Sequence, residues 1–287
     1  MTAVIIGASS GLGKGVAQQL AEEGANVVIG ARRTHLIKEL AKEIGPSAVA
    51  VTTDISKEAD VKRIHDAALE KFGKIDVWIN MAGVGLIGSY TELPVEDMKR
   101  LLDINVFGTM VGSQYALRQF KTQKSGILIN VGSVAAKVPF PYYATYSTSK
   151  FAVSGLSYGL QREMEVERYE DIHVCTVHPW ATDTPWFDHS GHRAQMKPMD
   201  EPKSVIEATI GLIDTPQESV EVGVKTKGST ISESLLPGLT EKFNANHVKN
   251  VIEEAPVSSN TPGSLHEPME NDTEVSAGWK TRLKMDE

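Results

Sequence analysis

The sequence contains a single cysteine, Cys175, among its 287 residues. An internal disulfide is therefore excluded, and this cysteine usage is typical of proteins from a reducing compartment. Cys175 lies within the apolar run Ile172–Val177, and a thiol in such a run is far more often a buried, inert group than a nucleophile. The sequence therefore gives no support to cysteine-based catalysis.

Long apolar runs and an excess of positive charge are also missing. No stretch approaches the ~20 apolar residues of a membrane-spanning helix. The formal net charge of −8 disfavours nucleic acid or an anionic membrane as the main partner. The first residues show neither a basic segment nor a leader cleavage site, so we expect a cytoplasmic location. No cluster of histidine, cysteine and carboxylate residues has the spacing of metal ligands, so we expect no metal.

Short runs rich in β-branched residues alternate with segments of helical periodicity. The expected strands are Ala3–Ile6, Asn26–Ile29, Ala48–Val51, Ile75–Ile79, Ile127–Val131, Ile172–Val177 and Val220–Val224. The expected helices are Gly13–Glu23, His35–Ile44, Lys57–Phe72, Val95–Phe120, Ser147–Arg168 and Lys203–Leu212. Apolar strands that alternate with helices predict a parallel sheet covered on both faces. Right-handed crossovers then give an α/β fold with a doubly wound, Rossmann-like sheet.

The character of the chain changes after about Lys225. Prolines and glycines recur there, and only Leu239–Ala255 has the pattern of a helix. Roughly 60 residues with so few apolar groups cannot build much of a core. We therefore expect a single domain over residues 1–225 and a partly helical C-terminal extension, not a second domain, over residues 226–287.

A glycine-rich loop follows the first expected strand and leads into a helix. Its sequence is Gly7-Ala8-Ser9-Ser10-Gly11-Leu12-Gly13. Gly7 permits a tight turn, Gly11 lets the backbone approach a pyrophosphate, and Gly13 lets the helix pack on the strand. The diphosphate would lie at the helix N-terminus, where free N–H groups favour anions. Three glycines alone are a weak pattern, but the strand–loop–helix context predicts a dinucleotide site.

The second expected strand ends in Gly30-Ala31-Arg32-Arg33. An NAD site usually has an acidic residue near this point to bind the ribose 2′-hydroxyl. Two guanidinium groups suit bidentate binding of a 2′-phosphate instead. The alternative is a pair of solvated arginines that open a helix, although cations at a helix N-terminus are mildly unfavourable. The sequence therefore predicts NADP (NADPH) as the cofactor.

Tyr146 and Lys150 stand four residues apart in the stretch Tyr-Ser-Thr-Ser-Lys. On a helix this spacing places both side chains on one face. A cation near a phenol favours the phenolate and lowers its pKa from about 10, so the tyrosine can act as an acid or base. The alternative is a solvated pair on a helix surface.

These motifs, in this order, resemble the short-chain dehydrogenases/reductases over roughly residues 1 to 225. Asp54-Ile55 is similar to the pair that contacts adenine, and Asn80-Met81-Ala82-Gly83 resembles the family's Asn-Asn-Ala-Gly. The cofactor-binding residues that the resemblance implies are Gly7, Ser9, Ser10, Gly11, Leu12, Gly13, Arg32, Arg33, Asp54, Ile55, Asn80, Ala82, Gly83, Tyr146, Lys150, Pro179 and Thr184. The catalytic residues that it implies are Asn105, Ser133, Tyr146 and Lys150.

The resemblance also implies a mechanism for an NADP-dependent ketoreductase or alcohol dehydrogenase. Tyr146 exchanges a proton with a carbonyl or secondary alcohol, and Lys150 lowers the pKa of Tyr146 and binds the nicotinamide ribose. Ser133 holds the substrate oxygen, and Asn105 positions a water in a proton relay to Lys150. NADPH supplies the hydride.

Two positions depart from the family pattern. Met81 replaces an asparagine, which favours a change in packing. Trp180 replaces the glycine that usually follows Pro179, so the loop is expected to run differently, with part of the indole facing the cleft. His178 lies at a strand end, where a structural role is more usual than a catalytic one.

The substrate is not specified by the sequence. Residues 180–200 are expected to form a lid, as loops beyond strand ends do in such folds. Five aromatic residues indicate a partly apolar pocket, although they would also suit a core: Phe140, Tyr142, Tyr143, Trp186 and Phe187.

Two other functions are compatible with parts of the pattern. A non-catalytic NADP-binding sensor would keep the fold but would have no need of Ser133, Tyr146 and Lys150. An epimerase or dehydratase on nucleotide sugars would need more chain for a sugar-nucleotide domain.

The two longest expected helices carry apolar or small residues on more than one face, so each needs a second packing partner. In the family that the chain resembles, these helices pair with their copies. We therefore expect a homodimer or homotetramer, with the extension over the cleft or on a neighbour. The alternative is a monomer with a disordered tail.

Overall fold

The computed structural model describes residues 1–138, 140–188, 199–223, 263–271 and 273–279, together with a few single residues between 226 and 251. Its strands are β1 (Thr2–Ile6), β2 (Asn26–Ala31), β3 (Ala48–Thr52), β4 (Val77–Asn80), β5 (Gly126–Val131), β6 (Ile172–His178) and β7 (Ser219–Glu221). Its helices are α1 (Gly11–Glu22), α2 (Thr34–Ile44), α3 (Glu58–Phe72), α4 (Val95–Leu102), α5 (Thr109–Gln123), α6 (Ala144–Val166) and α7 (Pro202–Asp214). A π-helical segment, η1 (Asp103–Gly108), joins α4 to α5, and a 3₁₀ turn, η2 (Val134–Ala136), follows β5.

The described strands form one seven-stranded sheet in the order β3-β2-β1-β4-β5-β6-β7. Every neighbouring pair is parallel. The chain progresses outward from β1 to β3 and then crosses back to place β4 on the other side of β1. Ligands bind at such a reversal, beyond the carboxyl ends of the strands. The predicted doubly wound, Rossmann-like sheet is therefore confirmed.

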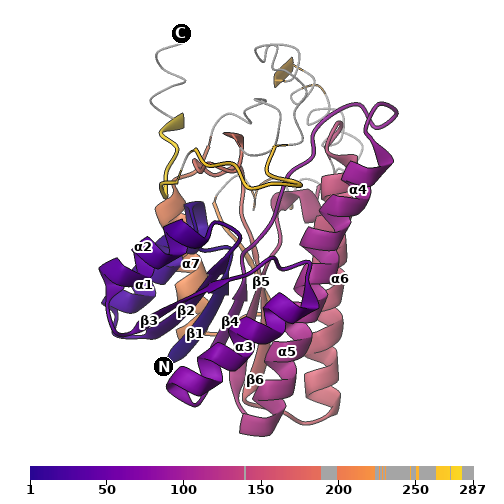
Figure 1. Cartoon of the computed structure of the whole chain (residues 1–287). Helices are drawn as coiled ribbons and strands as arrows, with labels where there is room; N and C mark the ends of the chain where they lie inside the picture. Colours follow the sequence, from indigo (N-terminus) through magenta and orange to yellow (C-terminus); the bar gives the residue numbers. More distant parts are fainter. Residues whose placement is uncertain are drawn as a thin grey trace.

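Helices cover both faces of the sheet (Figure 1). Alternate residues of a strand point to opposite faces, and Ile5 of β1 packs with the cluster under α1, α2 and α7, whereas Val4 packs with the cluster under α3, α5 and α6. Both side chains are completely buried. The two apolar cores fix the sheet, and its carboxyl edge is left for the loops.

Residues 263–271 and 273–279, drawn in yellow, cross above the strand ends at this edge (Figure 1). We call residues 263–271 the strap. Most of the predicted helix Leu239–Ala255, and residues 189–198 of the predicted lid, fall outside the described residues.

The predicted helix Val95–Phe120 is not one continuous α-helix. It consists of α4, the π-helical segment η1 and α5. The π-helical segment is short and lies within one continuous helical stretch of chain, and the sequence pattern did not distinguish it from an α-helix.

Candidate active site

One cleft runs along the carboxyl edge of the sheet and contains most of the predicted site residues. The predicted cofactor-binding residues that line it are Gly7, Ser9, Ser10, Gly11, Leu12, Gly13, Arg32, Arg33, Asp54, Ile55, Ala82, Gly83, Tyr146, Lys150, Pro179 and Thr184. Ser133 lines it as well. We call the part around Ser133, Tyr146 and Lys150 the catalytic end, and the part around Arg32, Arg33 and the strap the arginine end.

The glycine-rich loop leaves no room for side chains at two of its glycines. A Cβ on Gly7, whose φ is +104°, would lie 2.6 Å from the backbone nitrogen of Ala82, and one on Gly13 would lie 2.1 Å from the carbonyl oxygen of Gly7. A Cβ on Gly11 would instead face Thr184 at 3.6 Å. The tight turn and the close helix–strand packing of a dinucleotide loop are therefore both present, and the loop fits a pyrophosphate at the start of α1.

Arg33 braces this loop from the end of β2. Its Nε and Nη2 atoms each lie 3.1 Å from the Oγ atom of Ser9, and Nη2 also donates to Ser10. Its Nη1 atom donates to the carbonyl oxygens of Met269, at 3.0 Å, and Asn271, at 3.4 Å. Arg33 is only 7% exposed. Its hydrogen bonds connect the glycine-rich loop to the strap.

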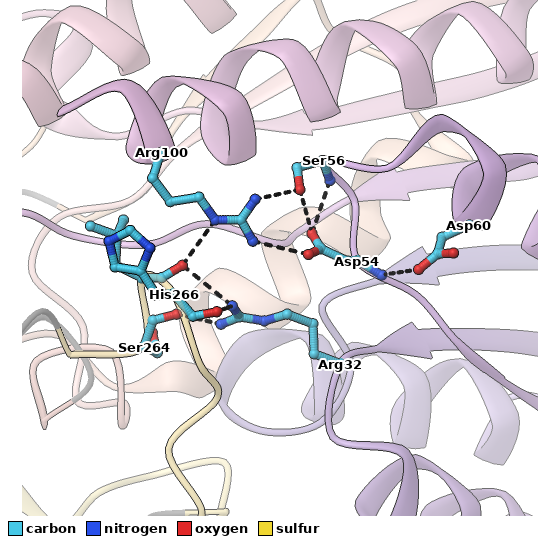
Figure 2. A network of polar contacts seen from close by, with 8 residues as sticks. Arg32, Asp54, Ser56, Asp60, Arg100, Ser264 and His266 are labelled. Carbon is cyan, nitrogen blue, oxygen red and sulfur yellow. Dashed lines mark hydrogen bonds and ion pairs between the residues drawn. The ribbon is translucent and has the colours of Figure 1, made fainter. Parts of the chain in front are cut away.

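Arg32 points to the strap as well. Its guanidinium donates to the carbonyl oxygens of Ser264, Leu265 (3.4 Å) and His266 (3.2 Å). Figure 2 shows Arg32, which follows β2, and Arg100, from α4, both reaching the strap. The Nε atom of Arg100 donates to the carbonyl of Leu265 at 3.2 Å. Backbone oxygens thus face the two cationic side chains.

Asp54, predicted to contact adenine, is held by its neighbours. Its carboxylate accepts from Arg100 at 2.9 Å and from the hydroxyl of Ser56 at 2.7 Å (Figure 2). Burial alone would raise the pKa of Asp54, but the hydrogen bonds from Ser56 and Arg100 outweigh burial and lower it. Asp54 therefore stays ionised and positions Arg100 beside the strap.

At the catalytic end, Tyr146 lies in the first turn of α6 and Ser133 follows β5. Burial raises the pKa of Tyr146 to about 12, although a hydrogen bond with Ser133 acts in the opposite direction. The Nζ atom of Lys150 lies 5.6 Å from the centre of the Tyr146 ring and donates to the carbonyl of Val131 at 2.9 Å. Burial lowers the pKa of Lys150 to about 8.

These values differ from the prediction that Lys150 lowers the pKa of Tyr146. Four-residue spacing does bring the two side chains together, but Lys150 is buried and Tyr146 is partly buried. Desolvation disfavours the charged form of each group, so it raises the pKa of the phenol and lowers that of the amine. Without a ligand, Tyr146 is a neutral phenol throughout the neutral range.

Asn105 lies behind the wall of the cleft, within η1. Its side chain makes hydrogen bonds to the backbone N–H and carbonyl of Val84, both at 2.9 Å, and donates to the hydroxyl of Ser149 at 3.1 Å. A Cβ on Gly83 would lie 3.5 Å from Lys150 Nζ and 3.6 Å from Asn105 Oδ1. Because Gly83 has no side chain, no Cβ atom lies between Asn105 Oδ1 and Lys150 Nζ at this point.

Asn80 does not line the cleft, although it was predicted to bind the cofactor. It is 2% exposed, donates to Asn130 at 2.8 Å and accepts from the indole of Trp78 at 2.9 Å. The side chain of Asn80 also bonds Ser113 of α5 at 3.3 Å. Its position at the end of β4 is the reason: side chains alternate between faces, and this one points into the core.

Aromatic residues form the wall beside Tyr146. The ring of Trp186 lies 5.1 Å from that of Tyr146, and Phe140 lies 6.2 Å from Trp180. Tyr143 and Phe187 also line the cleft. Trp180 thus faces the cleft, as predicted. Tyr142 does not line the cleft and is 36% exposed, so it is wrong as a pocket residue.

His178 is completely buried at the end of β6. Its Nδ1 atom lies 3.1 Å from the carbonyl oxygen of Ser133. Burial, together with the nearby charge of Lys137, lowers the pKa of His178 to about 4. The imidazole is therefore neutral and packs under the loop that carries Ser133.

The sequence predicted that the extension lies over the cleft or on a neighbour, but it did not identify the strap residues or Arg100 as part of the site. Leu265 is 0% exposed although it lies in a segment with few apolar residues. No periodicity marks such a contact. Ser264, Pro268 and Met269 line the cleft, and a sequence more than 200 residues away gives no sign of which loop they will meet.

Two features are absent from the described residues, a metal-binding cluster and a membrane-spanning helix. No group of three or more histidine, cysteine or carboxylate side chains could hold a metal ion. In the same residues, no helix has both the length and the apolar character to cross a membrane.

Comparison with known proteins agrees with this geometry. The family model for short chain dehydrogenases matches residues 1–195. "Uncharacterized oxidoreductase YxnA" of Bacillus subtilis is 35% identical over 250 residues, which is 84% of this chain and 70% of the relative.

Two solved structures have the same fold and contain nicotinamide cofactors. The 3-ketoacyl-(acyl-carrier-protein) reductase from Brucella melitensis, complexed with NADH, is 31% identical, with a TM-score of 0.71 over 78% of this chain and 98% of that one. An alcohol dehydrogenase from the archaeon Thermococcus sibiricus, complexed with 5-hydroxy-NADP, is 26% identical, with a TM-score of 0.70 over 78% and 96%. With its glycine-rich loop, its Ser133–Tyr146 pair and a match over residues 1–195, the chain belongs to the short-chain dehydrogenase/reductase family of oxidoreductases.

Proposed function

We propose that this protein is an NADP(H)-dependent oxidoreductase that interconverts a carbonyl compound and a secondary alcohol. The observation that carries the proposal is the Tyr146 hydroxyl, which bonds Ser133 on the wall of a cleft that also contains the glycine-rich loop and two arginines. An acid, an oxyanion donor and a dinucleotide cradle thus share one cavity. In this proposal residues 1–225 form the catalytic domain.

NADP is favoured over NAD by the end of β2. Arg32 and Arg33 both line the cleft there, at the point where NAD-binding members of such folds place an acidic residue. The glycine-rich loop would hold the pyrophosphate, and the guanidinium groups would bind the 2′-phosphate. When bound, the cofactor supplies or accepts the hydride.

Tyr146 is the proposed general acid and base. A phenol with a pKa of about 12 holds its proton at neutral pH and can donate it to a developing alkoxide. Ser133, within hydrogen-bond reach of the same hydroxyl, would hold the substrate oxygen and stabilise the charge that develops on it. In the direction of oxidation the same proton moves back to Tyr146.

Lys150 and Asn105 are proposed to replace the proton that Tyr146 gives up. With a pKa of about 8, Lys150 donates a proton as ammonium and accepts one as the neutral amine close to neutrality. The opening that Gly83 leaves between Lys150 and Asn105 would hold the water of the predicted relay. The Asn105 side chain bonds Val84 and Ser149, so it would hold that water in a fixed place.

The substrate is proposed to be a ketone with an apolar or aromatic substituent. Four aromatic side chains beside Tyr146 line the cleft, namely Phe140, Tyr143, Trp180 and Trp186. Such a wall favours apolar groups.

The decisive test is NADPH oxidation, followed by the loss of absorbance, with a panel of aliphatic, alicyclic and aromatic ketones. Turnover that Tyr146→Phe abolishes supports the proposal. Tight NADPH binding with no turnover on any ketone would instead favour a non-catalytic sensor.

We also propose that the protein is a homodimer or homotetramer in the cytoplasm. Phe107 is 52% exposed, Met110 45% and Phe151 46%, and all three lie on η1, α5 and α6. Large apolar groups on neighbouring helices indicate a surface that a second copy covers. A monomeric mass by light scattering would refute the assembly. Cys175 is a buried free thiol, and burial raises its pKa to about 11. Such a thiol fits the proposed location in a reducing compartment.

A further inference from the structure

The strap is anchored by an apolar side chain as well as by hydrogen bonds. Leu265 is completely buried in the same cluster as Ile55, Val84 and Ile104. A buried leucine stabilises its segment relative to an exposed one. Its carbonyl accepts from Arg100 as well as from Arg32. The strap is therefore held at a defined position by both apolar packing and hydrogen bonds.

The strap presents the chemistry of a phosphate to the arginine end. Arg32 donates to three of its carbonyl oxygens, and Arg33 donates to two more. The strap also carries the carboxylates of Glu267 and Glu270. The charge of Glu267 acts on Arg32, and Glu270 lies 3.3 Å from His35. Oxygen acceptors and anionic charge are also what a 2′-phosphate would offer to the same two guanidinium groups.

We propose that the strap competes with the 2′-phosphate of NADP for Arg32 and Arg33, and thereby determines how the protein discriminates between NADP and NAD. A guanidinium N–H that donates to a carbonyl must leave it before it can donate to a phosphate. NAD has a hydroxyl at this position and does not draw the arginines away from the strap. The inference rests on the proposed cofactor site.

Competition of this kind works in both directions. If the strap lowers the affinity for NADPH, then NADPH must loosen the strap by the same factor. The strap does not have to leave as one piece with the residues that follow it. Residues 273–279 are anchored separately, because Asp183 accepts from the backbone N–H of Trp279 at 2.9 Å and from the hydroxyl of Ser276 at 3.1 Å.

The first experiment removes the anchor without adding charge. Dissociation constants for NADPH and NADH are measured by titration calorimetry for wild type, Leu265→Asn and the matched control Leu265→Met, which keeps an apolar side chain of similar volume. We expect Leu265→Asn to bind NADPH about tenfold more tightly than wild type, a change of 1.4 kcal/mol. NADH affinity should change less than about twofold, and Leu265→Met should behave as wild type. Unchanged or weaker NADPH binding by a folded Leu265→Asn, or an equal gain for both nucleotides, overturns the inference.

The second experiment needs no variant and remains decisive if Leu265→Asn fails to fold. Hydrogen–deuterium exchange of the strap peptide is followed in wild type with no nucleotide, with saturating NADH and with saturating NADPH. We expect NADPH, and not NADH, to speed exchange in residues 263–271. Slower or unchanged exchange with bound NADPH would mean that the strap is a wall of the site and not a competitor. If wild type binds neither nucleotide, the proposed function itself is refuted.

Discussion

At the catalytic end of the cleft, the reacting groups come from short neighbouring stretches of chain, and Lys150 is buried while Ser133 and Tyr146 are partly buried. Burial raises the pKa of Tyr146 to about 12 against the opposite effect of its hydrogen bond with Ser133, and burial lowers that of Lys150 to about 8. At the arginine end, the groups come from segments more than 200 residues apart and are joined by many hydrogen bonds, several of them partly exposed. A substitution at the catalytic end should therefore alter the transfer of one proton. A substitution at the arginine end should instead remove one of several weak contacts.

The largest effect is expected from Tyr146→Phe. The ring and its packing against Trp186 remain, and the transferable proton is lost. General acid–base catalysis contributes about 10²–10⁴-fold, so kcat should fall by about that factor while the dissociation constant for NADPH stays within about twofold. Steady-state kinetics and calorimetry measure the two quantities. Comparable turnover in wild type and variant would remove Tyr146 from the mechanism.

Arg32→Ala should weaken NADPH binding by roughly tenfold to a hundredfold and leave NADH nearly unchanged. The reason is that a hydrogen bond to a charged group contributes about 1.5–3 kcal/mol. Arg33→Ala is the contrast: Arg33 also bonds Ser9 and Ser10 in the glycine-rich loop, so both cofactors should bind less tightly. Equal losses for both cofactors in Arg32→Ala would assign Arg32 a structural role.

The burial of Lys150 should be visible in the pH dependence of stability. Below about pH 8 the amine is protonated in both the folded and the unfolded protein. Between pH 8 and 10.5 the unfolded protein binds a proton that the folded protein has lost, so the free energy of unfolding rises with pH. Relative to Lys150→Met, wild type should gain about 2–3 kcal/mol over this range.

Urea unfolding of both proteins at several pH values measures this difference. Tyr146 titrates in both proteins, so the comparison isolates Lys150. A difference that stays constant from pH 7 to 10.5 would show that the amine is not desolvated.

The smallest effect is expected from His266→Ala on the strap. His266 lies 2.6 Å from Asp97, and the side chain is 44% exposed. Exposed ion pairs contribute about 0.2–1 kcal/mol, so the melting temperature should fall by a few degrees at most and NADPH affinity should change little. A gain in NADPH affinity as large as the one expected for Leu265→Asn would mean that the strap is held by charge and not by its apolar anchor.

The sequence predicted the fold because its evidence is local. Strand positions follow from apolar runs, and the observed β5, Gly126–Val131, differs by one residue from the expected run. Parallel strands then bring their carboxyl ends to one edge, so Gly11, Ser133 and Thr184 meet in one cleft although the sequence separates them.

Three features depended on information that local patterns do not contain. The π-helical turn at Asn105 is a short segment inside a continuous helical stretch, and the pattern of the whole stretch predicted one helix. The pKa of Tyr146 depends on burial, which spacing to Lys150 does not report. Contacts of Leu265 join residues far apart in the sequence, and a single leucine among prolines and charged residues predicts no partner.

The position of the strap near the end of the chain also sets an order of events during synthesis. The last described strand ends at Glu221 and the strap ends at Asn271. At 5–20 residues per second, roughly 3–10 s separate these two points on the ribosome. In that interval the glycine-rich loop, Arg32 and Arg33 have been made, but the strap, which competes with the 2′-phosphate for these two arginines, is not yet complete. A newly made protein is therefore exposed to cellular NADP before its strap can compete.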